Sequence, residues 1–180
     1  LARRQFRPQL PNRRLYGIFV KLKRVGKGGK KFNVFKLRTM HPYSEFLQAY
    51  IYDRYSLQEG GKFNHDIRVT TLGRIARKYW LDELPMLLNL IKGDMKLVGV
   101  RPISQHYFSL YSPELQAKRI CHKPGLLPPF YADMPKTLEE IEASEMRYLT
   151  MCEEKGTFKT DIIYFWRIFY TIVFKRARSH

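Results

Sequence analysis

The chain has 180 residues, a length that predicts about one domain, and its 44% hydrophobic and 27% charged residues are typical of a globular protein. Its formal net charge of +17 favours a polyanionic partner: nucleic acid, an anionic membrane face or a phosphate-rich ligand. Its two cysteines, Cys121 and Cys152, are too few for a disulfide-stapled secreted protein and favour a reducing compartment. The longest apolar stretch, 162–174, is interrupted by Arg167 and is shorter than the ~18 residues that a membrane span needs.

The positive charge is concentrated at the N-terminus. Residues 1–40 contain 13 Lys+Arg and no acidic residue, and the first carboxylate is Glu45. We interpret residues 1–15 as a basic arm. It is either a solvated, poorly ordered segment or a segment attracted to acidic lipid headgroups, at about 1 kcal/mol per basic residue. The chain also ends on basic residues, Lys175, Arg176 and Arg178.

The first expected elements form a β-hairpin. Residues 16–24 alternate in polarity as a strand does, 26–29 contain three glycines typical of a turn, and 32–38 return as a second strand. Residues 45–55 are expected to be helical, and Gly60-Gly61 ends that helix.

The remainder is predominantly helical. Thr71 is expected to cap a helix to about residue 79, a second helix runs from Asp82 to a stop at Gly93, and 95–100 form a short strand. Ser112-Pro113 begins another helix. Residues 137–140 form a capping box before an acidic helix to about 155, whose acidic face we expect to be solvated. The pattern predicts a single α/β (α+β) domain, mostly helical, with a small β-hairpin.

The last expected helix, 161–175, allows two interpretations. Ile162, Trp166, Phe169 and Val173 share one face, and basic residues follow. The helix either packs on the core in the ordinary way or lies as an amphipathic helix in the headgroup layer of a membrane.

The segment with the clearest chemistry is Asp82-Glu83-Leu84-Pro85. Pro85 is tolerated only in the first turn of a helix, which predicts Asp82 at or near the N-cap and Glu83 in the first turn. A helix N-terminus attracts phosphate and keeps a carboxylate ionised. Such a carboxylate can be a nucleophile, a base or a magnesium ligand. Taken alone, this spacing also fits a simple helix cap.

Basic residues on both sides favour the phosphate-binding interpretation. Arg68, Arg74, Arg77 and Lys78 precede the dyad and Arg101 follows it. Guanidinium groups match phosphate oxygens bidentately. Asp94 follows Gly93 and is expected to be a turn residue rather than a ligand.

An ordered series of motifs resembles the bacterial sugar transferases, the monotopic polyprenyl-phosphate phosphoglycosyl transferases. The similarity covers residues 16–125. Its motifs are Arg24-Val25-Gly26, Lys36-Leu37-Arg38-Thr39-Met40, Asp66, Arg68, Thr70, Gly73, Arg77, Leu81-Asp82-Glu83-Leu84-Pro85, Leu88, Asn89, Lys92-Gly93-Asp94-Met95, Leu97-Val98-Gly99, Arg101-Pro102 and Lys123-Pro124-Gly125.

The resemblance implies a reaction and a site. The family transfers a phosphosugar from a nucleotide diphosphate sugar to undecaprenyl phosphate and releases the nucleoside monophosphate, in the first membrane step of surface-glycan assembly. It implies that Asp82 is the nucleophile and forms a covalent phosphosugar intermediate. Glu83 matches the second carboxylate, which supports magnesium binding or deprotonation of the lipid phosphate. Mg²⁺ is the implied cofactor, with Asp82 and Glu83 as its ligands.

The resemblance also assigns phosphate-binding residues. Arg77 and Arg101 match phosphate binders of the family, and Lys36 and Arg38 lie in a segment that lines the same site. Arg68 is included as a further phosphate or substrate contact. The implied location is the cytoplasmic face of the bacterial inner membrane, peripheral or monotopic, and an anionic membrane surface is an expected partner.

The sequence departs from the family at four places, one of which is Val100, where a Pro often precedes the Arg-Pro pair. Family members usually carry a hydrophobic re-entrant helix before the hairpin, and residues 1–15 are too polar to form it. We expect either that this helix lies upstream of Leu1 or that the chain docks differently. Trp80 replaces a common Ser. Residues 126–133 differ from the sequence that usually follows Lys123-Pro124-Gly125, so the identity of the sugar donor is not predicted.

We expect residues 16–180 to form the catalytic domain. The alternative is a non-catalytic basic module that binds lipid or nucleic acid. No recognised nucleic-acid motif accompanies the charge, so no nucleic-acid partner is expected.

Overall fold

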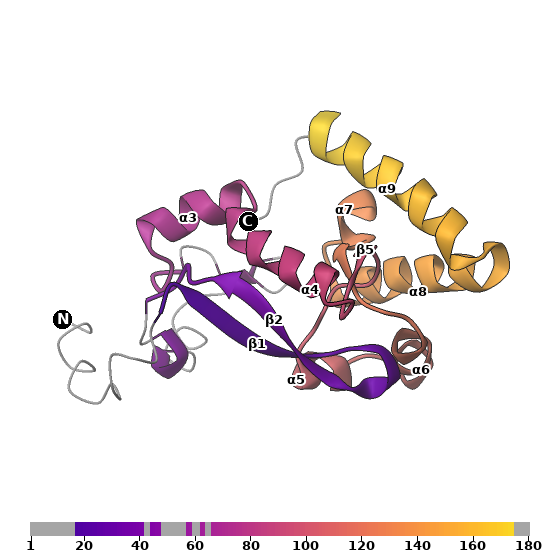
Figure 1. The fold of residues 1–180 in the computed structure, drawn as a ribbon, viewed down its shortest axis with the longest axis horizontal. Helices are drawn as coiled ribbons and strands as arrows, with labels where there is room; N and C mark the ends of the chain where they lie inside the picture. Colours follow the sequence, from indigo (N-terminus) through magenta and orange to yellow (C-terminus); the bar gives the residue numbers. More distant parts are fainter. Residues whose placement is uncertain (1–16, 42–43, 48–56, 59–61, 64–65, 175–180) are drawn as a thin grey trace.

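The computed structural model describes residues 17–41, 44–47, 57–58, 62–63 and 66–174 (Figure 1). The expected basic arm, most of the expected helix 45–55, the Gly60-Gly61 break and the basic C-terminal residues lie outside these ranges. Within the described part, no helix combines the length and the apolar character needed to cross a bilayer.

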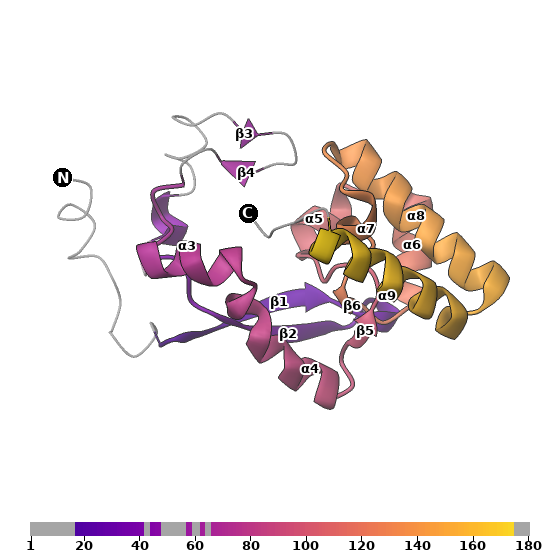
Figure 2. The ribbon, with the colours of Figure 1, turned by 90° about the horizontal axis from the view of Figure 1, so that it is seen from above.

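The expected hairpin is confirmed. Strand β1 (Phe19–Val25) pairs antiparallel with β2 (Lys31–Leu37), and the short 3₁₀ turn η3 (Lys27–Gly29) joins them. Gly28 and Gly29 both have positive φ, 69° and 71°, which is why glycine suits this turn. The two strands form a long ribbon that lies below α3 and α4 in Figure 1, and in Figure 2, seen from above, the chain between α3 and α4 crosses this ribbon.

Short elements follow the hairpin. These are the 3₁₀ turn η4 (Ser44–Leu47) and the antiparallel pair β3 (Leu57–Gln58) and β4 (Lys62–Phe63). Helix α3 (Thr71–Lys78) comes next. Its N-cap is Thr70, not Thr71 as the sequence predicted, because Thr70 is still extended and its hydroxyl accepts from the Gly73 N–H at 2.9 Å.

The predicted helix from Asp82 is wrong at its start. Residues Leu81–Met86 form a 3₁₀ segment, η5, and only Leu87–Ile91 are α-helical, as α4. Asp82 is therefore the second residue of η5, and Trp80 occupies the N-cap. Pro85 has no N–H to contribute to an α-helical ladder and lies inside the 3₁₀ segment. Gly93 ends this region with φ 75°, as predicted.

A second small sheet joins distant parts of the chain. Strand β5 (Lys96–Val98) pairs parallel with β6 (Gly125–Leu127). The predicted strand over 95–100 is present but shorter, and β6 was not predicted. A Cβ on Gly125 would lie 2.1 Å from the Gly99 nitrogen, so this close pairing requires glycine.

Helices make up the C-terminal half. They are α5 (Gln105–Ser109), α6 (Pro113–Cys121), α7 (Phe130–Asp133), α8 (Leu138–Lys155) and α9 (Thr157–Phe174). Thr137 caps α8 as predicted, accepting from the Glu140 N–H at 3.2 Å. Helix α9 begins four residues earlier than predicted, directly after Gly156 at φ 84°. It packs on α8 and α7 (Figure 1).

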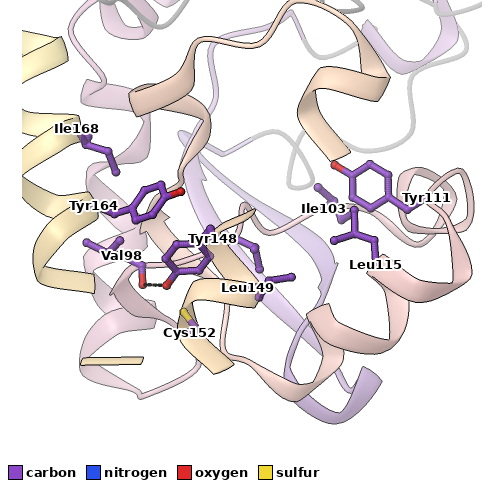
Figure 3. Close-up of a cluster of buried hydrophobic side chains, with 10 residues drawn as sticks. Val98, Ile103, Tyr111, Leu115, Tyr148, Leu149, Cys152, Tyr164 and Ile168 are labelled. Carbon is purple, nitrogen blue, oxygen red and sulfur yellow. Dashed lines mark hydrogen bonds between the residues drawn. The ribbon is translucent and has the colours of Figure 1, made fainter. Parts of the chain in front are cut away.

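The main core lies between α6, α8, α9 and the β5–β6 sheet (Figure 3). Its buried residues are Val98, Val100, Ile103, Tyr111, Leu115, Tyr148, Leu149, Cys152, Tyr164 and Ile168. A smaller cluster of Val34, Met86 and Met95 joins β2 to η5 and the segment after α4. The fold class is confirmed: a single, mostly helical α/β domain with a small hairpin.

Helix α9 has two different faces. Tyr164 and Ile168 are buried in the core, which satisfies the packing interpretation. The opposite residues Trp166, Phe169 and Val173 are 61%, 49% and 50% exposed, so the aromatic face predicted from the sequence is also present.

Helix α8 has the expected solvated acidic residues at both ends, including Glu153 and Glu154, and departs from the expectation at Glu145. Glu145 is only 3% exposed and forms a salt bridge with the equally buried Arg119 of α6. Glu139 and Glu140, at the helix start, are exposed as expected.

Candidate active site

Lys36 and Glu83 form the centre of the candidate site. The Lys36 ammonium lies 2.6 Å from Glu83 Oε1, and both side chains are largely buried. Asn89, completely buried in α4, positions this pair by holding η5–α4 against β2. Its amide donates to the Asn33 carbonyl at 2.7 Å and accepts from the Phe35 N–H at 3.1 Å.

Asp82 is buried beside this pair with one unused oxygen. Asp82 is only 7% exposed, and its Oδ1 has no hydrogen-bond partner among the described residues. Burial raises the pKa of Asp82, and the neighbouring Glu83 charge adds to this effect, while Lys36 and Arg77 oppose it. The site therefore holds a desolvated carboxylate beside cations, with one enclosed oxygen that lacks a hydrogen-bond partner.

Trp80, the residue before η5, has an unusual backbone conformation that determines how η5 leaves the end of α3. Its φ of 56° places a bulky residue in the left-handed region, which is energetically costly. The Trp80 N–H bonds to the Arg77 carbonyl at 3.2 Å, and its own carbonyl accepts from the Glu83 N–H at 3.0 Å. The indole N–H donates to the Tyr131 hydroxyl at 3.0 Å. These contacts connect the end of α3, the dyad and α7.

Arg77 approaches the dyad from α3. Its Nε donates to the Thr39 hydroxyl at 2.9 Å, and its charge interacts with Asp82 and Asp66. Burial lowers the pKa of Arg77, and the two carboxylates partly restore it. The close contact of α3 with the end of β2 depends on Gly73, because a Cβ there would lie 2.1 Å from the Thr39 carbonyl oxygen.

Arg68 lies next to this group in an ion pair with Asp66. Its Nε and Nη2 bond to the two Asp66 oxygens at 2.8 and 2.7 Å, and Arg68 is only 5% exposed. Its charge reaches Arg77, so it belongs to the same electrostatic cluster. Its predicted contact with phosphate stays a prediction.

A cation-lined cavity adjoins Glu83. It has a volume of about 70 Å³ and is lined by Arg24, Lys36, Glu83, Arg101, Pro102 and Tyr131, among others. The predicted residues Lys36, Glu83 and Arg101 thus meet in one place. The turn after β5 returns to this site, as the sequence predicted for Arg101-Pro102.

Arg24 is a cavity residue that the sequence analysis did not select. Burial and, after it, the charge of Arg101 lower the pKa of Arg24, and both guanidinium-bearing residues line this cavity together with Glu83. The period-two alternation of the strands could have identified Arg24 as a cavity residue. Leu22 and Arg24 lie on one face of β1, and Val34 and Lys36 lie on the matching face of β2. All four residues line the cavity.

Arg38 lies elsewhere. Its Nε donates to the Gly17 carbonyl at 2.9 Å, near the start of β1, and Arg38 is not among the residues that line the cavity. Asp94 is a structural residue as predicted, because its carboxylate accepts from the Asn89 amide at 3.3 Å.

The donor set fits a hard divalent cation. Asp82 Oδ1 is a buried carboxylate oxygen without a partner, and Glu83 supplies a second carboxylate. Mg²⁺ prefers one or two carboxylates together with substrate phosphates and water. Among the described residues, no three Asp, Glu, His or Cys side chains gather as a metal site, so phosphate oxygens and water would complete the coordination.

Fold and site together define a small α/β protein in which the Lys36–Glu83 pair lines a cation-rich cavity and the buried Asp82 lies beside that pair. Asp82, Arg77 and Arg68 are not among the residues that line the cavity. The sequence profile for bacterial sugar transferases matches residues 12–175. The chain therefore belongs to the bacterial sugar transferase family, which confirms the resemblance.

Individual relatives are sugar transferases too. The chain is 39% identical over 109 residues to an uncharacterized sugar transferase of Bacillus subtilis, covering 61% of this chain and 48% of the relative. It is 43% identical over 106 residues to the UDP-glucose:undecaprenyl-phosphate glucose-1-phosphate transferase of Caulobacter vibrioides (57% and 36% covered). It is 36% identical over 107 residues to a UDP-N-acetylgalactosamine-undecaprenyl-phosphate N-acetylgalactosaminephosphotransferase of Aeromonas hydrophila (57% and 22%). The matched part spans less than half of each relative.

Proposed function

We propose that this protein transfers a phosphosugar from a UDP-sugar to undecaprenyl phosphate and releases UMP, in the first membrane step of polysaccharide or glycoconjugate synthesis. The observation that carries the proposal is Asp82: a buried carboxylate, with an unpartnered oxygen, flanked by Lys36, Arg77 and Glu83. Family membership and the printed activities of two relatives support the same reaction.

The reaction has two steps at one phosphorus. The Asp82 carboxylate attacks the sugar-linked phosphorus, the bond to the bridging oxygen breaks, and UMP leaves with the bonding electron pair. A phosphate oxygen of undecaprenyl phosphate then attacks the same phosphorus and frees Asp82. Because phosphoryl transfer needs positioning and charge neutralisation, the cations Arg24, Lys36 and Arg101 are well suited to hold the diphosphate.

Glu83 has two proposed roles: it accepts a proton in the second step, or it helps to bind the metal ion. Its carboxylate, held 2.6 Å from the Lys36 ammonium, is suited to accept the proton of the lipid phosphate. Mg²⁺, when bound, would neutralise the charge that develops on the diphosphate. Asp82 and Glu83 are the residues that would hold it.

A membrane surface is part of the proposal. Exposed apolar residues occur on α3, η5–α4 and α9, and also at Ile18 and Phe19 at the start of the hairpin. On α3, α4 and α9 the most exposed are Leu72, Ile91, Phe158, Phe174 and Trp166. This arrangement supports peripheral or monotopic association with the cytoplasmic face of the inner membrane, where the lipid acceptor resides.

The test is UMP release. The protein is mixed with Mg²⁺, undecaprenyl phosphate in detergent and a panel of UDP-sugars, with Asp82→Asn and the exposed-carboxylate control Glu114→Gln in parallel. We expect UMP with at least one donor, loss of release in Asp82→Asn, and unchanged release in Glu114→Gln. Donor alone should release one UMP per enzyme and add the phosphosugar mass to the chain. Turnover that persists in Asp82→Asn contradicts the proposal, and no release with any donor favours a non-catalytic module.

A further inference from the structure

A second cavity adjoins the site from the opposite side of Glu83. It has a volume of about 240 Å³, and its walls are apolar or aromatic apart from Glu83. Trp80, Leu84, Leu87, Leu127, Tyr131 and Ile172 are its main lining residues. They come from η5 with its N-cap residue, α4, β6, α7 and α9, so five elements meet around one apolar space.

The two cavities share a wall. Glu83, Leu126 and Tyr131 line both of them. One side of this wall presents Arg24, Lys36 and Arg101, and the other presents leucines, Trp80 and Ile172. A ligand complementary to both sides is an amphiphile, with an anionic head next to the cations and an apolar chain beginning directly behind it.

From this arrangement we infer that the apolar cavity seats the first isoprene units of the lipid acceptor, while its phosphate lies in the cation-lined cavity. The inference rests on the function proposed above and adds the place of the acceptor chain. An apolar cavity of about 150 Å³ already holds a benzene molecule, so this one has room for roughly one or two isoprene units.

The cavity opens to the surface, and one of its walls is held in place by side-chain contacts. Leu84 and Leu87 are 54% and 45% exposed, so a chain can enter from the surface. Trp80 and Tyr131 form the rigid side, through the indole–hydroxyl hydrogen bond and an edge-to-face ring contact at 5.8 Å between centroids. Trp80 and residues of the 126–133 segment, Leu126, Leu127 and Tyr131, all contribute to this wall, so they shape acceptor recognition.

Trp80 provides a direct readout. The chain has two tryptophans, and the other, Trp166, is exposed on α9 away from the cavity lining. In a Trp166→Phe background, Trp80 is the only tryptophan. The probe is farnesyl phosphate, a short water-soluble isoprenyl phosphate, used below its aggregation limit. Inorganic phosphate, farnesol and UMP are the comparison ligands.

We expect farnesyl phosphate to shift Trp80 emission to the blue with saturation, and Leu84→Gln or Leu87→Gln to weaken its binding about tenfold. The same variants should raise the KM for undecaprenyl phosphate by a larger factor than they change the acceptor-independent release of UMP. Leu88→Gln is the matched control, because Leu88 is 51% exposed on the same helix and does not line the cavity.

Three results overturn the inference: no emission shift with farnesyl phosphate, an equal shift with UMP or inorganic phosphate, or an equal loss in Leu88→Gln. Failure of the proposed function is distinguishable. If no UMP is released in the presence of donor, the reaction is wrong. If UMP release is intact but Trp80 does not respond, only the assignment of the cavity is wrong.

Discussion

Arg119 of α6 donates a hydrogen bond from Nη2 to the main-chain oxygen of Arg101 at 2.6 Å, and thereby fixes the backbone of a residue in the cation-lined cavity. Arg119 itself is 6% exposed and pairs with the buried Glu145 of α8. Burial lowers the pKa of Arg119 to about 10, so it stays charged at neutral pH. The core of the helical half is thus connected directly to the active site.

Arg119→Ala should destabilise the protein by about 3–5 kcal/mol, because Glu145 is left as a buried charge without a partner. The double variant Arg119→Met/Glu145→Leu should recover most of this stability, since it removes both charges and keeps the volume. Its UMP release should nevertheless stay low, because the Arg101 carbonyl has lost its donor. Denaturant unfolding and turnover are measured on both variants. Full turnover in the double variant would show that Arg119 has only a structural role.

The Lys36–Glu83 pair gives a second prediction. Lys36→Met removes a cation from the cavity and leaves Glu83 partly buried without it, so UMP release should fall about a hundredfold. Lys31→Met, at an exposed position of the same strand, is the matched control and should change turnover little. Equal losses in the two variants would assign the effect to the general charge of the hairpin instead.

Asn89 offers a stability prediction. Asn89→Leu keeps a similar volume but removes the partners of the Asn33 carbonyl and the Phe35 N–H, which should cost about 1–3 kcal/mol for each group that is left buried. Denaturant unfolding measures this loss. Leu88→Gln, next to it on the exposed face, should stay within about 0.5 kcal/mol of the wild type. Asn89→Asp should lie between the two, because a carboxylate can still accept from Phe35.

Local signals predicted much of the fold. The period-two alternation of β1 and β2, the glycines of the turn and the Thr137 cap act within a few residues, so the sequence reveals them directly. The motif around Asp82 and Glu83 likewise identified the region of the site. Its detailed form was missed, because the left-handed Trp80 and the 3₁₀ geometry of η5 depend on how α3 and β2 pack against that segment.

Long-range pairs were not predictable in the same way. Arg119 and Glu145 are separated by 26 residues, and Asn89 and Asn33 by 56. Strand β6 has only three residues and depends on the close approach of Gly125 to Gly99. Arg24 became a site residue only when the register of the hairpin placed it opposite the loop of Arg101. In each case tertiary packing, not a local preference, selects the partner.

Asp66 and Arg68 lead to a pH prediction. Burial alone would raise the pKa of Asp66, but the hydrogen bonds and the charge of Arg68 outweigh burial, so the pKa in the folded protein is lowered. A lowered folded-state pKa means that the ionised pair stabilises the fold above the unfolded value of about 4. This contribution is lost as the pH falls from there through the folded-state value.

Asp66→Asn should therefore lower the Tm at pH 7, and the difference from the wild type should shrink as the pH falls from about 4 towards 3, because protonated Asp66 then resembles the amide. Thermal unfolding of both proteins across this range measures the effect. Glu114→Gln, which removes an exposed carboxylate without an ion pair of this kind, serves as the control and should show little difference at any pH. A Tm difference for Asp66→Asn that is constant with pH would mean that shape, not the charge of the Arg68 pair, accounts for the stabilisation.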